Sequence, residues 1–130
     1  MRITDLLDAR SVSLTSSPKT KSEALDQAVA LMTKSGKIND EEAYRSQVYA
    51  REEESTTGIG EGIAIPHGKC DAVSRPGLAA MVIKNGVDFD SLDGEPVTLL
   101  FLIAAPNTKD NVPLDVLSKG TFTAWSIIKS

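Results

Sequence analysis

Apolar side chains between Leu25 and Met32 recur at positions i, i+3, i+4 and i+7, which is the spacing of one face of an α-helix. Thr20 and Glu23 stand just before this stretch at the spacing of a capping box, which satisfies amide donors at a helix start. Gly36 can end the helix because glycine readily adopts the backbone conformation of a helix terminus. The pattern predicts a helix that packs against the protein through its apolar face.

A second helix is predicted to begin near Asn39. Asn39 and Glu42 repeat the capping-box spacing, and acidic residues suit the positive end of a helix. This helix should run to about Glu53. Upstream, residues 3–9 suggest a short helix, and residues 12–14 alternate in polarity as in a brief edge strand.

Three apolar runs predict β-strands. Residues 63–65 form a short run. Residues 78–83 are almost continuously apolar, as in a strand that is buried on both faces, and residues 97–105 form the most hydrophobic strand. Residues 84–86 suggest a turn, and residues 87–94 suggest a loop or hairpin. Helices interleaved with such strands predict an α/β fold, in which a central mixed β-sheet is covered by helices on both faces.

The composition restricts the classes of function. The chain has 130 residues, most simply one domain, and its 18 Asp and Glu against 14 Lys and Arg argue against nucleic-acid binding. Its longest apolar stretch, residues 97–105, is too short to span a bilayer, and its start lacks the apolar core of a signal peptide. A single cysteine, Cys70, excludes an internal disulfide and suits a reducing compartment. We therefore expect a soluble cytoplasmic domain.

The only histidine of the chain, His67, follows three closely spaced glycines. Pro66 should stop the strand predicted for residues 63–65, because proline lacks the backbone donor that a β-ladder needs. His67 would then lie where a strand leaves the sheet. Gly68 would let the backbone turn and leave the imidazole open to an incoming group, which makes His67 a candidate nucleophile.

Plainer interpretations compete with this one. A lone histidine is more often a surface residue or a satisfied core group than a catalyst. The glycines at positions 58, 60 and 62 lack the spacing of a dinucleotide-binding motif, and they lead into a strand instead of a helix. Cys70 lies three residues from His67, but no residue is placed to orient such a pair. A single histidine without matching cysteine or carboxylate spacing predicts no metal site.

Arg51 and Thr57 are candidates for binding an anion. Arg51 lies near the end of the second predicted helix, and its planar donors suit phosphate oxygens. The alternative is a surface arginine paired with one of the acidic residues 52–54. Thr56 and Thr57 could offer hydroxyls and amides to an anion, or they could be turn residues; of the two we prefer Thr57, which adjoins the glycines.

The segment from Arg51 to Gly68 resembles the active-site signature of the enzyme IIA domains of the sugar phosphotransferase system, fructose/mannitol class. The resemblance extends from Met1 to about Lys119. Residues 1–7 and 77–84 most resemble the fructose-specific branch of this class. The family's architecture is the α/β sandwich that the apolar pattern also predicts.

This resemblance implies a phosphotransferase that carries a phosphoryl group on His67, with Arg51 and Thr57 stabilising the phosphoryl oxygens. The donor would be the phosphohistidine of the carrier protein HPr, and phosphoenolpyruvate would be the ultimate source. The acceptor would be a cysteine of an enzyme IIB domain, which can be fused with IIA in one IIABC chain. The resemblance implies fructose-type sugar uptake, no cofactor, no metal, and a membrane contact only through the IIC component.

The C-terminal part departs from the family. Residues 110–119 resemble its last segment, but Pro113 stands where a second histidine is usual, and proline cannot supply the hydrogen bonding of an imidazole. We therefore divide the chain into an IIA-type phosphocarrier domain, residues 1–119, and a divergent segment, residues 120–130, with an incomplete last helical region. Apolar sheet surface left uncovered there should be occluded, which predicts a homo-oligomer.

Two other functions stay open. Nitrogen-related enzyme IIA proteins share the fold and use phosphorylation to switch partner contacts, so the chain could be a regulatory binding module. Residues 77–84 and 111–119 favour the sugar branch. The second alternative, which Pro113 and the altered ending motivate, is a remnant of an enzyme IIA domain with impaired activity.

Overall fold

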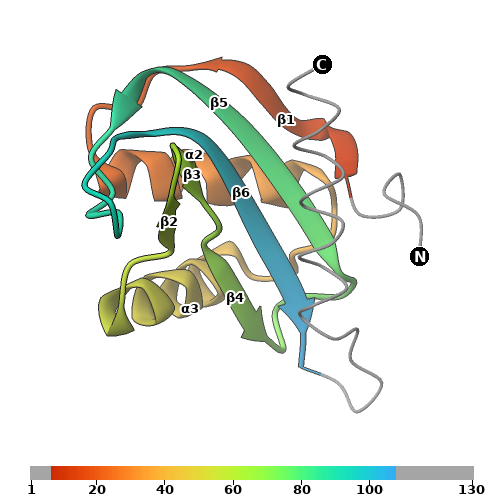
Figure 1. The fold of residues 1–130 in the computed structure, drawn as a ribbon. Coiled ribbons are helices and arrows are strands. Elements are labelled where there is room, and N and C mark those ends of the chain that lie inside the picture. The colour runs from red at the N-terminus through yellow and green to blue at the C-terminus, as the bar shows by residue number, and fades with distance from the viewer. Residues whose placement is uncertain (1–6, 108–130) are drawn as a thin grey trace.

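The computed structural model describes residues 7–107 of the 130. In this range one strand precedes two consecutive helices, and five further strands follow them (Figure 1). The elements are β1 (Leu7–Ser16), α2 (Lys21–Lys34), α3 (Glu41–Glu54), β2 (Gly58–Gly60), β3 (Ile63–Ala64), β4 (His67–Cys70), β5 (Gly77–Val87) and β6 (Val97–Pro106).

The strands form one six-stranded mixed sheet in the order β1-β5-β6-β3-β2, with β4 also paired to β6. β1 runs parallel to β5, β5 and β6 form an antiparallel pair, and β3 and β4 both run parallel to β6. The register places Ile63 opposite Leu99 and His67 opposite Ile103, so β3 and β4 follow each other along the same side of β6. The predicted mixed sheet is confirmed.

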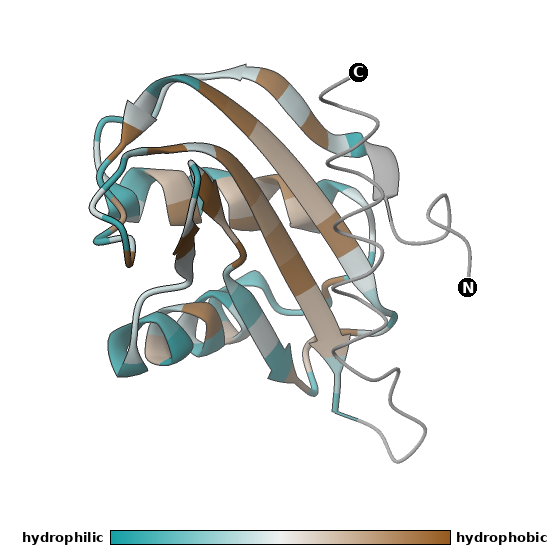
Figure 2. Cartoon of the chain, viewed as in Figure 1, coloured by the Kyte–Doolittle hydropathy of each residue, from teal (hydrophilic) through white to brown (hydrophobic). Residues whose placement is uncertain are grey.

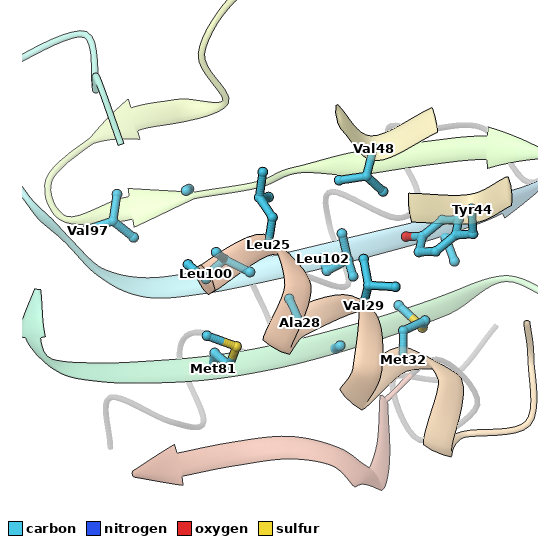
Figure 3. Packing of buried hydrophobic residues seen from close by; sticks show 14 of the residues in the cluster. Leu25, Ala28, Val29, Met32, Tyr44, Val48, Met81, Val97, Leu100 and Leu102 are labelled. Carbon is cyan, nitrogen blue, oxygen red and sulfur yellow. The ribbon is translucent and has the colours of Figure 1, made fainter. Parts of the chain in front are cut away.

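The helices α2 and α3 lie against one face of this sheet (Figure 1). Figure 3 shows Leu25, Val29 and Met32 of α2 directed at the strands, with Val48 and Tyr44 of α3 beside them. Burial of these apolar side chains supplies the main driving force for packing the layers. The predicted apolar face of the first helix is therefore confirmed.

The opposite face of the sheet is also buried. Leu78 and Ala80 of β5 and Phe101 and Ile103 of β6 are at most 2% exposed, which confirms the predicted burial of residues 78–83 on both faces and shows the same for β6. Figure 2 shows hydrophobic residues concentrated along these two strands and hydrophilic residues along α3. Three predictions concern residues outside the described range. They are the incomplete last helical region, the replacement of a histidine by Pro113, and the surface for self-association.

The predicted helix starts are correct to within one residue. The Thr20 hydroxyl accepts a hydrogen bond from the Glu23 amide at 3.1 Å, and the Glu23 carboxylate accepts one from the Lys19 amide at 3.2 Å, so both members of the capping box are used. At α3 the cap is Asp40, whose carboxylate accepts from the Ala43 amide at 3.1 Å, and not the predicted Asn39. Aspartate caps a helix as well as asparagine does, so local spacing could not separate these neighbours.

Two local predictions were wrong. Leu7 to Ala9 belong to strand β1 instead of a helix, because Leu7 pairs with Leu78 of β5 and this long-range ladder overrides a weak local pattern. Residues 84–86 are not a turn between elements, since β5 continues through them to Val87. The ladder with β6 shifts its register between Val82 and Val87, and Gly86 adopts a positive φ of 70°. The residues predicted as a turn are thus an irregularity within a strand.

Gly68 has a different role from the predicted turn. It lies inside β4, and a Cβ atom built there would stand 3.0 Å from Tyr44 Cε1 and 3.0 Å from Val48 Cγ2. A glycine at this position therefore allows α3 to approach the strand that begins with His67.

We expect Gly68→Ala to lower the free energy of unfolding by about 1–3 kcal/mol, because Tyr44 and Val48 are fully buried and cannot easily move aside. Urea denaturation followed by circular dichroism measures the change. Adding Val48→Ala should make the loss smaller than the sum of the two single losses, since it removes the methyl group that the new Cβ meets. Strictly additive losses, or an unchanged Gly68→Ala variant, would contradict this packing argument.

Candidate active site

A surface groove of about 240 Å³ brings together the three residues that the sequence predicts for the site. Arg51 reaches it from the last turn of α3, Thr57 from the segment before β2, and His67 from the start of β4. The other residues lining it are Thr56, Ile59, Ile65 and Ile103. The groove therefore combines an imidazole, a guanidinium and two hydroxyls with an apolar wall.

His67 lies at an interruption between two short strands. β3 ends at Ala64, one residue earlier than predicted, and the chain does not leave the sheet at Pro66, because the Pro66 carbonyl accepts a hydrogen bond from the Ile103 amide at 3.0 Å. His67 consequently starts β4 and pairs with Ile103, which corrects the prediction that a strand leaves the sheet at this point. The imidazole is carried by a strand that is fixed on both sides of the proline.

The half-buried imidazole of His67 has a defined hydrogen-bond partner. Its Nδ1 atom lies 3.3 Å from the carbonyl oxygen of Ile65. A carbonyl oxygen can only accept, so this bond requires the proton on Nδ1. The neutral ring then carries its lone pair on Nε2, which is the state that a nucleophilic imidazole needs.

Arg51 is held at the end of its own helix. Its Nη1 donates to the Ser55 carbonyl at 2.9 Å and approaches the Ser55 hydroxyl at 3.4 Å. Within residues 7–107 the structure shows no ion pair between Arg51 and any of the acidic residues 52–54, so the alternative of a paired surface arginine finds no support. Arginine has five N–H donors, and the bonds to Ser55 use those of Nη1 alone.

Thr57 is buried, with 5% of its surface exposed. Its hydroxyl donates to Glu52 Oε1 at 2.5 Å, and its amide donates to Glu52 Oε2 at 2.8 Å. Its carbonyl accepts from the Ile65 amide at 3.0 Å. To donate to a phosphoryl oxygen, the Thr57 hydroxyl would have to give up its hydrogen bond to Glu52. The role of Thr57 in stabilising the phosphoryl group stays a prediction.

The glycines form a tight hairpin between β2 and β3. Glu61 and Gly62 both have positive φ angles, 58° and 79°, as in a two-residue turn that reverses a right-twisted strand pair. Asp93 secures the turn, since its carboxylate accepts from the Glu61 amide at 2.9 Å and from the Glu95 amide at 3.0 Å. These two bonds, the one from Glu61 first, hold the pKa of Asp93 below its usual range.

Two residues beneath the site were missed by the sequence interpretation. Tyr44 is fully buried and donates its hydroxyl proton to the Ile103 carbonyl at 2.7 Å, and burial raises the pKa of Tyr44 well above its usual range, so it stays a donor. Glu52 is only 8% exposed. Tyr44, Val48 and Glu52 follow one another at four-residue steps on the buried face of α3, and this spacing was the available signal. Cys70, by contrast, packs partly buried against the core.

Comparison with known proteins identifies the family. Residues 5–119 match the family described as "Phosphoenolpyruvate-dependent sugar phosphotransferase system, EIIA 2". The chain belongs to this family. Its members act as phosphotransferase carriers, so the resemblance inferred from residues 51–68 is confirmed at this level.

Two curated relatives of this EIIA domain are fructose-specific. The "PTS system fructose-specific EIIABC component" of Bacillus subtilis is 44% identical over 119 residues, which cover 92% of this chain and 19% of that protein. The "PTS system fructose-specific EIIA component" of Haloferax volcanii is 40% identical over 107 residues, covering 82% of this chain and 70% of that protein. The chain thus spans about a fifth of the first relative and more than two thirds of the second.

Solved structures of related domains confirm the α/β fold. The nitrogen regulatory protein IIA-Ntr from Neisseria meningitidis superposes with a TM-score of 0.82 at 30% identity, covering 98% of this chain and 88% of that one. The mannitol enzyme IIA in the complex with phosphorylated enzyme IIB from Escherichia coli superposes with a TM-score of 0.74 at 28% identity, covering 89% and 81%. Neither helix in the described part of this EIIA domain has the length and apolar character of a membrane span.

Proposed function

We propose that this EIIA domain accepts a phosphoryl group from phospho-HPr on Nε2 of His67 and passes it to a cysteine of an enzyme IIB domain during fructose-type sugar uptake. The observation that carries the proposal is the hydrogen bond between Nδ1 and the Ile65 carbonyl, because it leaves the lone pair on Nε2. His67 also lines the same groove as Arg51, which can neutralise phosphoryl oxygens.

The transfer requires no redistribution of protons on His67. The Nε2 lone pair forms the new nitrogen–phosphorus bond, while the electrons of the broken bond return to the ring nitrogen of the donor histidine. Nδ1 keeps its proton and its bond to the Ile65 carbonyl throughout. Charge on the phosphoryl oxygens is the main quantity to stabilise in such a step, and Arg51 and Thr57 are the candidates for this role.

The proposed acceptor rests on two relatives. The B. subtilis relative is an EIIABC component, and the E. coli mannitol enzyme IIA has been solved in a complex with phosphorylated enzyme IIB. A phosphohistidine suits such a relay, because its nitrogen–phosphorus bond is labile and hands the group onward. The fructose assignment follows the two relatives at 44% and 40% identity.

A reconstituted relay tests this function. The protein is incubated with phosphoenolpyruvate, enzyme I and HPr, and its intact mass is measured under alkaline conditions, which preserve phosphohistidine. We expect one added phosphoryl group, and we expect its loss when a fructose-type IIB domain is added. A folded sample that gains no mass would refute the proposal.

A nitrogen-type regulatory module is the second candidate, and the IIA-Ntr structure at a TM-score of 0.82 is the observation that favours it. The higher identity to the two fructose-specific relatives weighs against it. A protein that is phosphorylated in the relay but fails to pass the group to any IIB domain, and that binds a kinase or regulator differently in its two states, would support this second function.

A further inference from the structure

A buried carboxylate, Glu52, lies on the last turn of α3 and adjoins Arg51, which lines the groove. Glu52 continues the buried face formed by Tyr44 and Val48, and only 8% of it is exposed. A buried carboxylate is costly unless its oxygens are hydrogen-bonded or paired with a cation. The carboxylate of Glu52 therefore needs hydrogen-bond donors or a cation, and the groups that fill this need indicate what the residue does.

Both carboxylate oxygens of Glu52 are used. Oε1 accepts from the Thr57 hydroxyl, while Oε2 accepts from the Thr57 amide and lies 3.0 Å from Nζ of Lys21. Lys21 comes from the first turn of α2 and also lies over the ring of Phe89, 4.8 Å from its centre. Glu52 thus ties the segment before β2 to both helices through a single side chain.

From Thr57 a continuous series of hydrogen bonds leads to the imidazole. The Thr57 carbonyl accepts from the Ile65 amide at 3.0 Å, and the Ile65 carbonyl lies 3.3 Å from Nδ1 of His67. Thr57 is therefore fixed by Glu52 on its amide and hydroxyl, and it fixes Ile65 with its carbonyl. The position of the atom that orients His67 depends on this series.

We propose that Glu52 is a positioning residue for His67, which acts through Thr57 and Ile65 to hold the imidazole proton on Nδ1 and the lone pair on Nε2. The proposal rests on the proposed function, because it assigns Glu52 to the same phosphoryl transfer. Glu52 does not touch the phosphoryl group. It sets the tautomer and the direction of the ring that does.

The variant Glu52→Gln tests this role in the full chain. Glutamine keeps the volume, but its amide nitrogen cannot accept, so at least one of the two bonds from Thr57 is lost. We expect the ¹⁵N spectrum of the imidazole to shift from the Nδ1–H tautomer toward the Nε2–H tautomer. The initial rate of phosphoryl acceptance from phospho-HPr should fall by up to about 100-fold, because a small misplacement of the reacting nitrogen is enough for a loss of this size. Since His67 is the only histidine, its ring signals need no assignment among several residues.

The matched control is Glu53→Gln, which removes the same charge from the neighbouring position, where the side chain is exposed. It should leave both the tautomer and the rate unchanged. If Glu52→Gln does not fold, the variant Thr57→Val tests the proposal instead, because it removes only the hydroxyl donor. It should shift the tautomer in the same direction by a smaller amount. A folded Glu52→Gln or Thr57→Val variant with the wild-type tautomer would overturn the proposal.

The two proposals fail in distinguishable ways. The tautomer is measured without a phosphoryl donor, so it tests Glu52 even if the wild-type protein accepts no phosphoryl group. A wild-type protein that is phosphorylated, beside a Glu52→Gln variant with the same rate and tautomer, would refute the positioning role alone.

Discussion

Replacing His67 by glutamine should abolish phosphoryl incorporation, from one group per chain to a level that cannot be detected. Glutamine has similar bulk and can still bond to the Ile65 carbonyl, but its amide nitrogen has no lone pair that attacks phosphorus. Because the chain has no second histidine, no other imidazole can take over. Intact mass under alkaline conditions, after incubation with phosphoenolpyruvate, enzyme I and HPr, measures the loss.

Cys70→Ser is the matched control for this experiment. Cys70 is the only thiol, lies three residues from His67 on the same strand, and packs partly against the core. Its variant should still gain one phosphoryl group, since the proposed chemistry uses the imidazole alone. Incorporation that persists in His67→Gln and disappears in Cys70→Ser would place the acceptor on the thiol and contradict our assignment.

The strands of the sheet could be predicted from the sequence where the apolar pattern is strong. Residues 97–105 and 78–83 carry enough consecutive apolar side chains to specify buried strands, and both strands are present. β4 could not be predicted, because its sequence, His-Gly-Lys-Cys, has no strand-forming pattern of its own. Its extended conformation is imposed by the ladder with β6 and by the approach of α3 to Gly68.

The residues that line the groove could be predicted from the sequence, but the buried residue that holds them in place could not. His67, Arg51 and Thr57 stand out by residue type and by their place around the glycines, and the structure brings them to one groove. The burial of Glu52 was not predicted, because Glu52 belongs to an acidic run at a helix end and such a run is usually exposed to solvent. The four-residue spacing from Tyr44 through Val48 was the one signal for position 52, and the packing of α3 shows that position 52 turns inward while position 53 faces solvent.

Replacing Arg51 should slow phosphoryl acceptance strongly without unfolding the domain. We expect Arg51→Ala to lower the initial rate by about 10²–10³-fold, the usual effect of removing one donor that stabilises charge in a transition state. Arg51→Lys should recover only part of this loss, because an ammonium keeps the charge but cannot present two parallel N–H donors. Single-turnover transfer from phospho-HPr, followed by intact mass, measures both rates.

Arg45→Lys is the matched control, since Arg45 lies on the same helix and its guanidinium pairs with Glu41, Glu42 and Asp26 away from the groove. It should leave the rate unchanged. The Ser55 carbonyl holds Nη1 of Arg51 at the end of α3, so the guanidinium is oriented before the phosphoryl group arrives. If Arg51→Lys transfers at the wild-type rate, the two-donor geometry is not used, and charge alone accounts for the contribution of Arg51.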